Sequence, residues 1–262
     1  MSGPRSRPPN VLVLCYHGVS ETWPDPLAVS PEKLRRQVAR LLAGGWLPAT
    51  FTEAATAPSA PRTFAITFDD ALLSVSRLAL PVLGELGVPA TVFTPTAYSS
   101  EARVSAWPGV DRWLGTDHEG ELLGMGWPDL ARLRDAGWEV GSHSVTHAAL
   151  TDLDDPALQA ELRDSKLAIE RQLGACRSVA YPYGAVDDRV ASTAKAIGDE
   201  AGAAVLALRH GGDRMRVPRV PVLGGESELV RRLHLTRGMR RLQATRPWPA
   251  VQRAARAVRR SG

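Results

Sequence analysis

The chain has 262 residues, 44% of them hydrophobic, and a formal net charge of +4. This length allows one large domain or two small ones, and so small a charge excludes a surface given over to nucleic-acid binding. Two cysteines make no disulfide framework, and Cys15, inside an apolar run, is predicted to be a buried thiol. No window is long and apolar enough to span a membrane, and the N-terminus lacks the apolar core of a signal peptide. The sequence therefore predicts a cytoplasmic protein without a nucleic-acid partner.

Short apolar runs alternate with helical patterns along most of the chain. The runs predict strands at residues 11–15, 63–68, 90–93, 138–141, 178–181 and 203–208. Helices are expected between them, the first beginning at Ser30-Pro31, and later ones covering 75–86, 128–136, 155–174 and 188–197. Residues 94–126 have no clear period, which is typical of a functional or mobile loop. The alternation predicts an α/β fold with a parallel sheet or barrel, whose chemistry gathers at the C-terminal strand ends.

The C-terminal part differs in composition. Residues 226–262 are rich in arginine, and Pro247 and Pro249 divide them into two expected helices. We therefore expect a main domain over residues 10–225 and a basic helical tail over 226–262. The tail either packs on the domain as a solvated segment or makes peripheral contact with anionic lipid on the inner face of the membrane.

Two adjacent carboxylates, Asp69 and Asp70, follow the second predicted strand. Neighbouring residues at a strand end point in different directions, so one carboxylate can bind a metal while the other faces the metal-bound water. The alternative is a helix N-cap, a position at which aspartate is favoured. The pair alone does not decide between these interpretations.

Two histidines follow the fourth predicted strand. His143 and His147 are four residues apart, a spacing that places both on one face of a helical turn and suits two nitrogen ligands on one ion. Together with the aspartates they give three metal ligands and one spare carboxylate. This is the composition of a catalytic metal site with a base beside it.

Two further strand ends carry polar or turn-forming residues. Tyr181-Pro182-Tyr183-Gly184 predicts a turn that can aim a backbone N–H into a cleft, although it can also simply end the strand. His17 follows the first strand and is expected at the same rim, or else as a hydrogen-bonded buried histidine.

The three motifs Thr67–Asp70, His143–His147 and Tyr181–Gly184, in this order, resemble those of the polysaccharide deacetylase family, carbohydrate esterase family 4 or the NodB homology domain. The resemblance extends over about residues 11–223. It implies a distorted (β/α) barrel that removes acetyl groups from N-acetylated sugars with a divalent metal, usually zinc. The opening Tyr16–Val19 is similar to the branch that includes poly-β-1,6-N-acetylglucosamine deacetylases.

The resemblance also implies a role for each residue. Asp70, His143 and His147 would bind the metal, and Asp69 would be the general base. Tyr183 would supply its backbone N–H to the oxyanion. In the branch just named, the general acid is a histidine from an N-terminal strand, which corresponds to His17. His234, in the tail, superficially resembles the late acid motif and ranks second.

The chain departs from the family pattern at particular positions. Ala71 replaces the glycine that usually follows the aspartates, and Ala180 stands where many members carry an arginine that steadies the base. Arg219 is a candidate substitute for that arginine. The usual secretion signal is missing, which favours a lipid-linked or nucleotide-linked amino sugar over a cell-wall polymer.

The sequence leaves other functions open. An O-acetyl esterase or a cyclic-amide hydrolase would use the same metal triad. A degenerate, non-catalytic glycan-binding protein would tolerate the alanines at positions 71 and 180. The intact ligand set favours an enzyme, a metal-dependent carbohydrate deacetylase.

Overall fold

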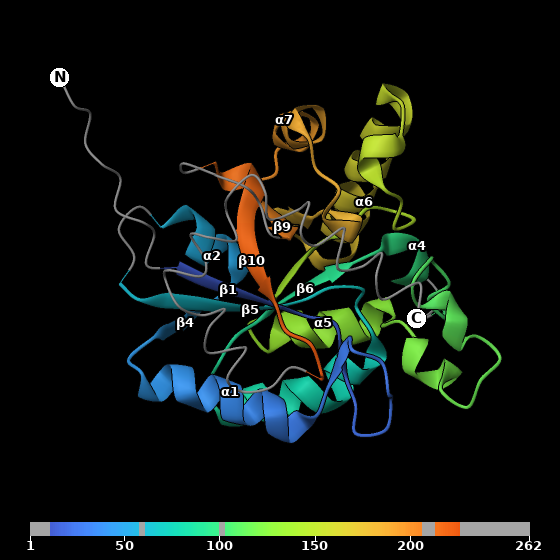
Figure 1. The fold of residues 1–262 in the computed structure, drawn as a ribbon. Helices are drawn as coiled ribbons and strands as arrows, with labels where there is room; N and C mark the ends of the chain where they lie inside the picture. The colour runs from blue at the N-terminus through green and yellow to red at the C-terminus, as the bar shows by residue number, and fades with distance from the viewer. Residues whose placement is uncertain (1–10, 58–60, 100–102, 206–212, 226–262) are drawn as a thin grey trace, which may run out of the picture.

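Parallel strands close into a ring at the centre of the computed structural model, which describes residues 11–57, 61–99, 103–205 and 213–225 (Figure 1). Around the ring, β1 pairs with β5 on one side and with β10 on the other, and each remaining strand pairs with its neighbours in the sequence. The ring strands are β1 (Val11–Tyr16), β5 (Thr63–Phe68), β6 (Thr91–Thr94), β7 (Glu139–Ser142), β8 (Ser178–Ala180), β9 (Ala201–Val205) and β10 (Val217–Pro221). The predicted distorted (β/α) barrel is confirmed.

The apolar runs form strands that are buried on both faces. Every residue of β5 is buried, because its outward side chains contact helices and its inward side chains fill the barrel. One edge of β5 is shared. The short β4 (Leu47–Ala49) pairs with residues 63–65, and β6 pairs with Thr67 and Phe68. A separate pair, β2 (Gly18–Val19) and β3 (Ala28–Val29), lies in the loop after β1.

Helices connect the strands and cover the outside of the ring (Figure 1). Ser30 caps the first of them, accepting a hydrogen bond from the backbone N–H of Lys33, and Asp154 and Asp187 cap two others in the same way. The helices are α1 (Pro31–Ala43), α2 (Phe51–Thr56), α3 (Leu80–Glu85), α4 (Thr96–Ser99), α5 (Trp127–Asp135), α6 (Asp155–Leu173) and α7 (Asp188–Ile197). A π-helical turn, Val75–Ala79, leads into α3. None of the helices in the described ranges is both long enough and apolar enough to cross a membrane.

The predicted strands and helices are present with small shifts of their ends. The sequence missed the helices α2 and α4, the short strands β2, β3 and β4, and the strand β10. The strand expected at residues 203–208 begins earlier, at Ala201, and residues 206–208 lie outside the described part. The tail over residues 226–262 also lies outside it, so the boundary between domain and tail remains a prediction.

Candidate active site

Three side chains converge where β5 and β7 end. The Nε2 atoms of His143 and His147 lie 3.5 and 3.2 Å from Oδ1 of Asp70. One ligand atom from each residue lies within 4.8 Å of the others, and all three side chains are buried. Because the strands are parallel, their C-terminal ends share one rim, which brings together residues more than 70 positions apart.

A tight turn after β5 presents the two aspartates to different partners. Asp70 and Ala71 both have left-handed backbones, with φ of 68° and 49°. The N–H of Asp69 donates to the carbonyl of Tyr16 at 3.0 Å, and the N–H of Met125 donates to the carbonyl of Ala71 at 2.8 Å. The turn therefore keeps Asp69 beside β1 and directs Asp70 toward the histidines, so the helix N-cap alternative does not describe these residues.

The histidines lie on a loop rather than on the helical turn expected from their spacing. Left-handed backbones at Ser144 and His147, with φ of 64° and 63°, prevent a helix here. Glu161 on α6 braces the loop, since its carboxylate accepts from the N–H groups of Val145 and Thr146 at 2.8 and 2.9 Å. The i, i+4 spacing selected two histidines that do converge on Asp70, but the helical backbone proposed for them was wrong.

The donor set fits a divalent cation. Oδ1 of Asp70 is buried, and it finds no hydrogen-bond donor among the described residues. His143 directs Nε2 toward the same point, because its Nδ1 contacts the carbonyl oxygen of Ala180 at 2.8 Å. Metal-ligating histidines in proteins usually hold their second nitrogen in this way. Two imidazoles and one carboxylate are a ligand set found in catalytic zinc sites.

Burial and charge act in opposite directions on these groups. Burial raises the pKa of Asp70, but the close Nε2 atoms of His143 and His147 outweigh it and hold that pKa well below its usual range. Burial lowers the pKa of His143, and the adjacent carboxylates reverse this so that it lies above its ordinary value. For His147 burial prevails, and the pKa is lowered. The carboxylate is thus ionised, as a metal ligand must be.

Asp69 is held by a buried arginine. Nη1 and Nη2 of Arg219 donate to Oδ1 and Oδ2 of Asp69 at 2.6 and 2.7 Å, and Nη1 also donates to Oγ1 of Thr67 at 3.1 Å. The guanidinium lies over the ring of Phe93, 5.4 Å from its centroid. Burial raises the pKa of Asp69, but Arg219 outweighs it and the pKa falls to about 2. The contact suggested from sequence between Arg219 and the candidate base is confirmed.

His17 and Cys15 also lie beside Asp69. One ligand atom from each of Cys15, His17 and Asp69 lies within 4.8 Å of the others. His17 is half-buried, and its Nδ1 is buried without a hydrogen-bond partner in the described ranges. Cys15 is buried as predicted, and burial raises the pKa of its thiol. Because Arg219 already neutralises Asp69 and the thiol is protonated, these three residues offer no free anionic ligand to a second cation.

The turn after β8 reaches the same rim. Tyr183 has a left-handed backbone with φ of 57°, and its ring lies with its centroid 4.7 Å from that of His147. Tyr183 is 54% exposed, so the turn borders solvent as well as His147.

Some residues around the site were not found from the sequence. Glu161 carries no signal there, because a glutamate on a helix is ordinary. Trp107 lies within residues 94–126, a segment without a clear period in the sequence, yet its ring stacks on His147. His234, the second candidate acid, lies outside the described residues.

Comparisons with known proteins agree with this geometry. The family model described as "Polysaccharide deacetylase" matches residues 56–202, more than half of the chain. No curated protein sequence matches.

Solved structures share the fold at low identity. A polysaccharide deacetylase from Bacillus cereus is 21% identical with a TM-score of 0.66, and the match covers 83% of this chain and 66% of that one, just under two thirds. The Streptococcus pyogenes deacetylase PplD, solved with acetate, is 18% identical with a TM-score of 0.68, covering 84% and 96% of the two chains. IcaB from Ammonifex degensii is 24% identical with a TM-score of 0.64, covering 81% and 91%.

Proposed function

Because the chain belongs to the polysaccharide deacetylase family, we propose that it is a metal-dependent hydrolase that removes N-acetyl groups from an amino-sugar glycan or from a lipid-linked or nucleotide-linked sugar precursor. One observation carries the proposal: a buried Asp–His–His triad lies at the same barrel rim as an ionised aspartate fixed by an arginine. The triad suits a cation, and the spare carboxylate suits a base.

Asp70, His143 and His147 would hold a divalent cation, for which zinc is our choice. When bound, such an ion acts as a Lewis acid that polarises a carbonyl and lowers the pKa of a water molecule to about 7. The protein's part is to keep Asp70 ionised and to present Nε2 of His143 through the contact of its Nδ1 with the carbonyl of Ala180.

Asp69 would accept the proton of the attacking water. Its pKa of about 2 keeps it ionised at neutral pH, and the two-point contact with Arg219 fixes both oxygens. A carboxylate with so low a pKa is a weak base. It would therefore accept a proton only from a neighbouring water molecule whose own pKa has been lowered.

The remaining roles fall to Tyr183 and His17. The backbone N–H of Tyr183 would donate to the oxyanion that forms on the acetyl carbonyl, and one such donor is typically worth about 3 kcal/mol. His17, when protonated, would donate a proton to the departing amine, which is a poor leaving group until protonated. The proximity of Tyr183 to His147 and of His17 to Asp69 supports these assignments.

The test is acetate release from N-acetylglucosamine oligomers, measured with zinc and with a chelator. We expect zinc-dependent release by the wild-type protein and a loss of at least about 100-fold in Asp69→Asn, because a positioned base contributes roughly that much. Asp69→Asn should still bind zinc, which also verifies that it is folded. Full activity in this variant would remove Asp69 from the role of base.

The same assay separates the alternatives. Acetylated xylan and small cyclic amides would be preferred by an O-acetyl esterase or a cyclic-amide hydrolase on this scaffold. A non-catalytic glycan-binding protein would release no acetate from any of them. The two departures that favoured such a protein are compensated, since Arg219 contacts Asp69 and Ala71 adopts the left-handed turn. Peripheral membrane contact through the tail and a cytoplasmic location stay predictions.

A further inference from the structure

An aromatic ring from the irregular segment lies face to face with one of the candidate metal ligands. The rings of Trp107 and His147 are nearly parallel, at 19°, with centroids 4.1 Å apart. Trp107 is buried, although it belongs to a loop and not to the barrel. A stacked indole restricts rotation of the imidazole about its side-chain bonds, because the imidazole cannot tilt without losing contact or colliding.

The two histidine ligands are held differently. Nδ1 of His143 contacts the carbonyl oxygen of Ala180 at 2.8 Å, the usual arrangement for a metal ligand. Nδ1 of His147 is buried and has no hydrogen-bond partner among the described residues. Apart from the contact of Nε2 with Asp70, the orientation of the His147 ring therefore depends on its ring contacts, with Trp107 on its face and Tyr183 at an angle of 73°.

Trp107 is itself firmly placed. The ring of Tyr98 meets it edge-on, with centroids 4.9 Å apart and an angle of 89°. Its other apolar neighbours form what we call the rim cluster, a group of buried residues from three loops: Trp23, Ala28, Leu72, Trp107, Val110 and Leu122. The ring that contacts His147 is thus supported from behind.

The segment that carries Trp107 is also tied to the turn that carries Asp70. The N–H of Ser105 donates to the carbonyl of Leu122 at 2.9 Å, closing the segment on itself. The N–H of Leu73 donates to Leu123 at 2.7 Å, and the N–H of Met125 donates to Ala71 at 2.8 Å. The backbone next to one ligand therefore anchors the loop whose indole orients another.

We propose that Trp107 is a positioning residue for the metal ligand His147, and that its stacked ring does for this histidine what the Ala180 carbonyl does for His143. The inference rests on the metal site proposed above. It assigns a function to the irregular segment, namely to deliver one indole to the face of one ligand.

Metal affinity measures this role directly. We would determine the zinc affinity of the purified full chain by competition with a chromogenic chelator, for the wild type, Trp107→Leu and Trp107→Phe. Loss of an outer contact of a metal ligand typically costs 10- to 100-fold in affinity. We expect Trp107→Leu, which keeps apolar volume but cannot stack, to lose at least about tenfold, and Trp107→Phe, which keeps a flat ring, to lose less than about threefold.

A matched control distinguishes positioning from mere packing. Trp113 borders the same rim cluster, but its ring contacts Trp23 and its Nε1 donates to Asp25 at 2.7 Å. Trp113→Leu should lower thermal stability and leave zinc affinity unchanged. In the metal-free protein, the His147 ring protons should move downfield in NMR spectra of Trp107→Leu, where the ring current of the indole is lost, and keep their positions in Trp113→Leu.

The outcomes separate the two proposals. A wild-type protein that binds no zinc would overturn the metal site and the role of Trp107 with it. Wild-type affinity in folded Trp107→Leu, or an equal loss in Trp113→Leu, would overturn the positioning role alone. If Trp107→Leu does not fold, Trp107→Met, which fills more of the volume, is measured in its place with the same expected loss.

Discussion

At the scale of single residues, Arg219 explains how a charged Asp69 is tolerated inside the barrel. Both side chains are almost completely buried, and an isolated carboxylate there would cost several kcal/mol. The parallel pair of hydrogen bonds satisfies both oxygens, leaving the carboxylate ionised and fixed. The partners are 150 positions apart in the sequence, so the pairing was suggested by the family resemblance and not by a local pattern.

The buried pair predicts strong thermodynamic coupling. Arg219→Met should lower the free energy of unfolding of the metal-free protein by about 3–5 kcal/mol, because it leaves Asp69 buried without a counter-charge. The double variant Asp69→Asn/Arg219→Met should recover a large part of that loss, since neither charge remains. Urea unfolding of the wild type and the three variants gives the coupling energy. If the losses of unfolding free energy in the two single variants add up to that of the double variant, with a coupling energy below about 0.5 kcal/mol, the two residues do not stabilise the protein as a pair.

At the scale of elements, the turn after β5 explains why family members commonly carry glycine where this chain has Ala71. Ala71 adopts a φ of 49°, a conformation that glycine reaches freely and alanine reaches at a cost of about 1–2 kcal/mol. The methyl group of Ala71 is buried in the main core cluster, which offsets part of that cost. Ala71 thus adopts a backbone conformation that glycine would reach without strain.

This balance predicts how substitutions at position 71 behave. Ala71→Gly should change the free energy of unfolding by less than about 1 kcal/mol, because relief of the left-handed backbone offsets the lost methyl and the added entropy of the unfolded chain. Ala71→Val should cost more than about 2 kcal/mol, since a β-branched side chain is strained at positive φ. Ala65→Gly is the control: Ala65 is also buried, but it lies in β5, outside the left-handed region, and its replacement should cost about 1–2 kcal/mol. Equal losses at positions 65 and 71 would contradict the argument.

The same elements show what a sequence can predict here. Strand ends were found because apolar runs stop at polar residues, and parallel strands then bring those residues to one rim. The strand β10 was missed because Pro218 and Pro221 are unusual inside a sheet. The loop between the histidines was mistaken for a helical turn because serine rarely adopts a positive φ. Nothing in the sequence therefore indicates the left-handed backbone of Ser144.

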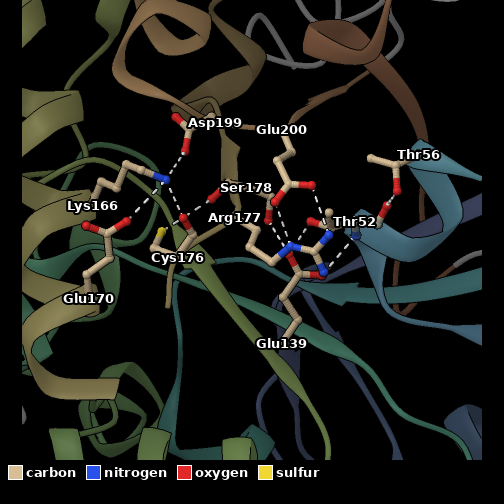
Figure 2. A network of polar contacts seen from close by, with 10 residues as sticks. All are labelled: Thr52, Thr56, Glu139, Lys166, Glu170, Cys176, Arg177, Ser178, Asp199 and Glu200. Carbon is tan, nitrogen blue, oxygen red and sulfur yellow. Dashed lines mark hydrogen bonds and ion pairs between the residues drawn. The ribbon is translucent and has the colours of Figure 1, made fainter. Parts of the chain in front are cut away.

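At the scale of the whole molecule, the two ends of the barrel have different tasks. The candidate chemistry lies at the C-terminal strand ends, while polar contacts close the opposite end (Figure 2). There Glu139, the first residue of β7, accepts from the N–H of Thr52 at 2.9 Å and from the hydroxyl of Ser178 at 2.6 Å. Lys166 of α6 contacts the carbonyl of Cys176 and, at 3.3 Å, Oδ1 of Asp199. These contacts join α2, α6 and the starts of three strands, so they stabilise the scaffold without touching the site.

The Lys166–Asp199 pair makes the stability of this end depend on pH. Burial raises the pKa of Asp199, and the attraction of Lys166 offsets only part of this effect. The resulting pKa is about 6, compared with an ordinary value of 3.8. The folded protein therefore holds this proton more tightly than the unfolded chain, and the contribution of Asp199 to stability is full below about pH 4 and is lost as the pH rises through about 6.

Asp199→Asn removes this titration and keeps an oxygen that can accept from Lys166. The free energy of unfolding of the variant, minus that of the wild type, should therefore increase by about 2–2.5 kcal/mol between pH 4 and pH 7, as a pKa difference of about two units implies. Urea unfolding of metal-free protein across this range measures the difference, and parallel curves would contradict the assignment. Because Asp199 lies at the far end of the barrel from Asp70 and the histidines, zinc affinity and kcat at neutral pH should stay as in the wild type. A change in either would mean that the two ends are coupled, contrary to the division of tasks argued from the fold.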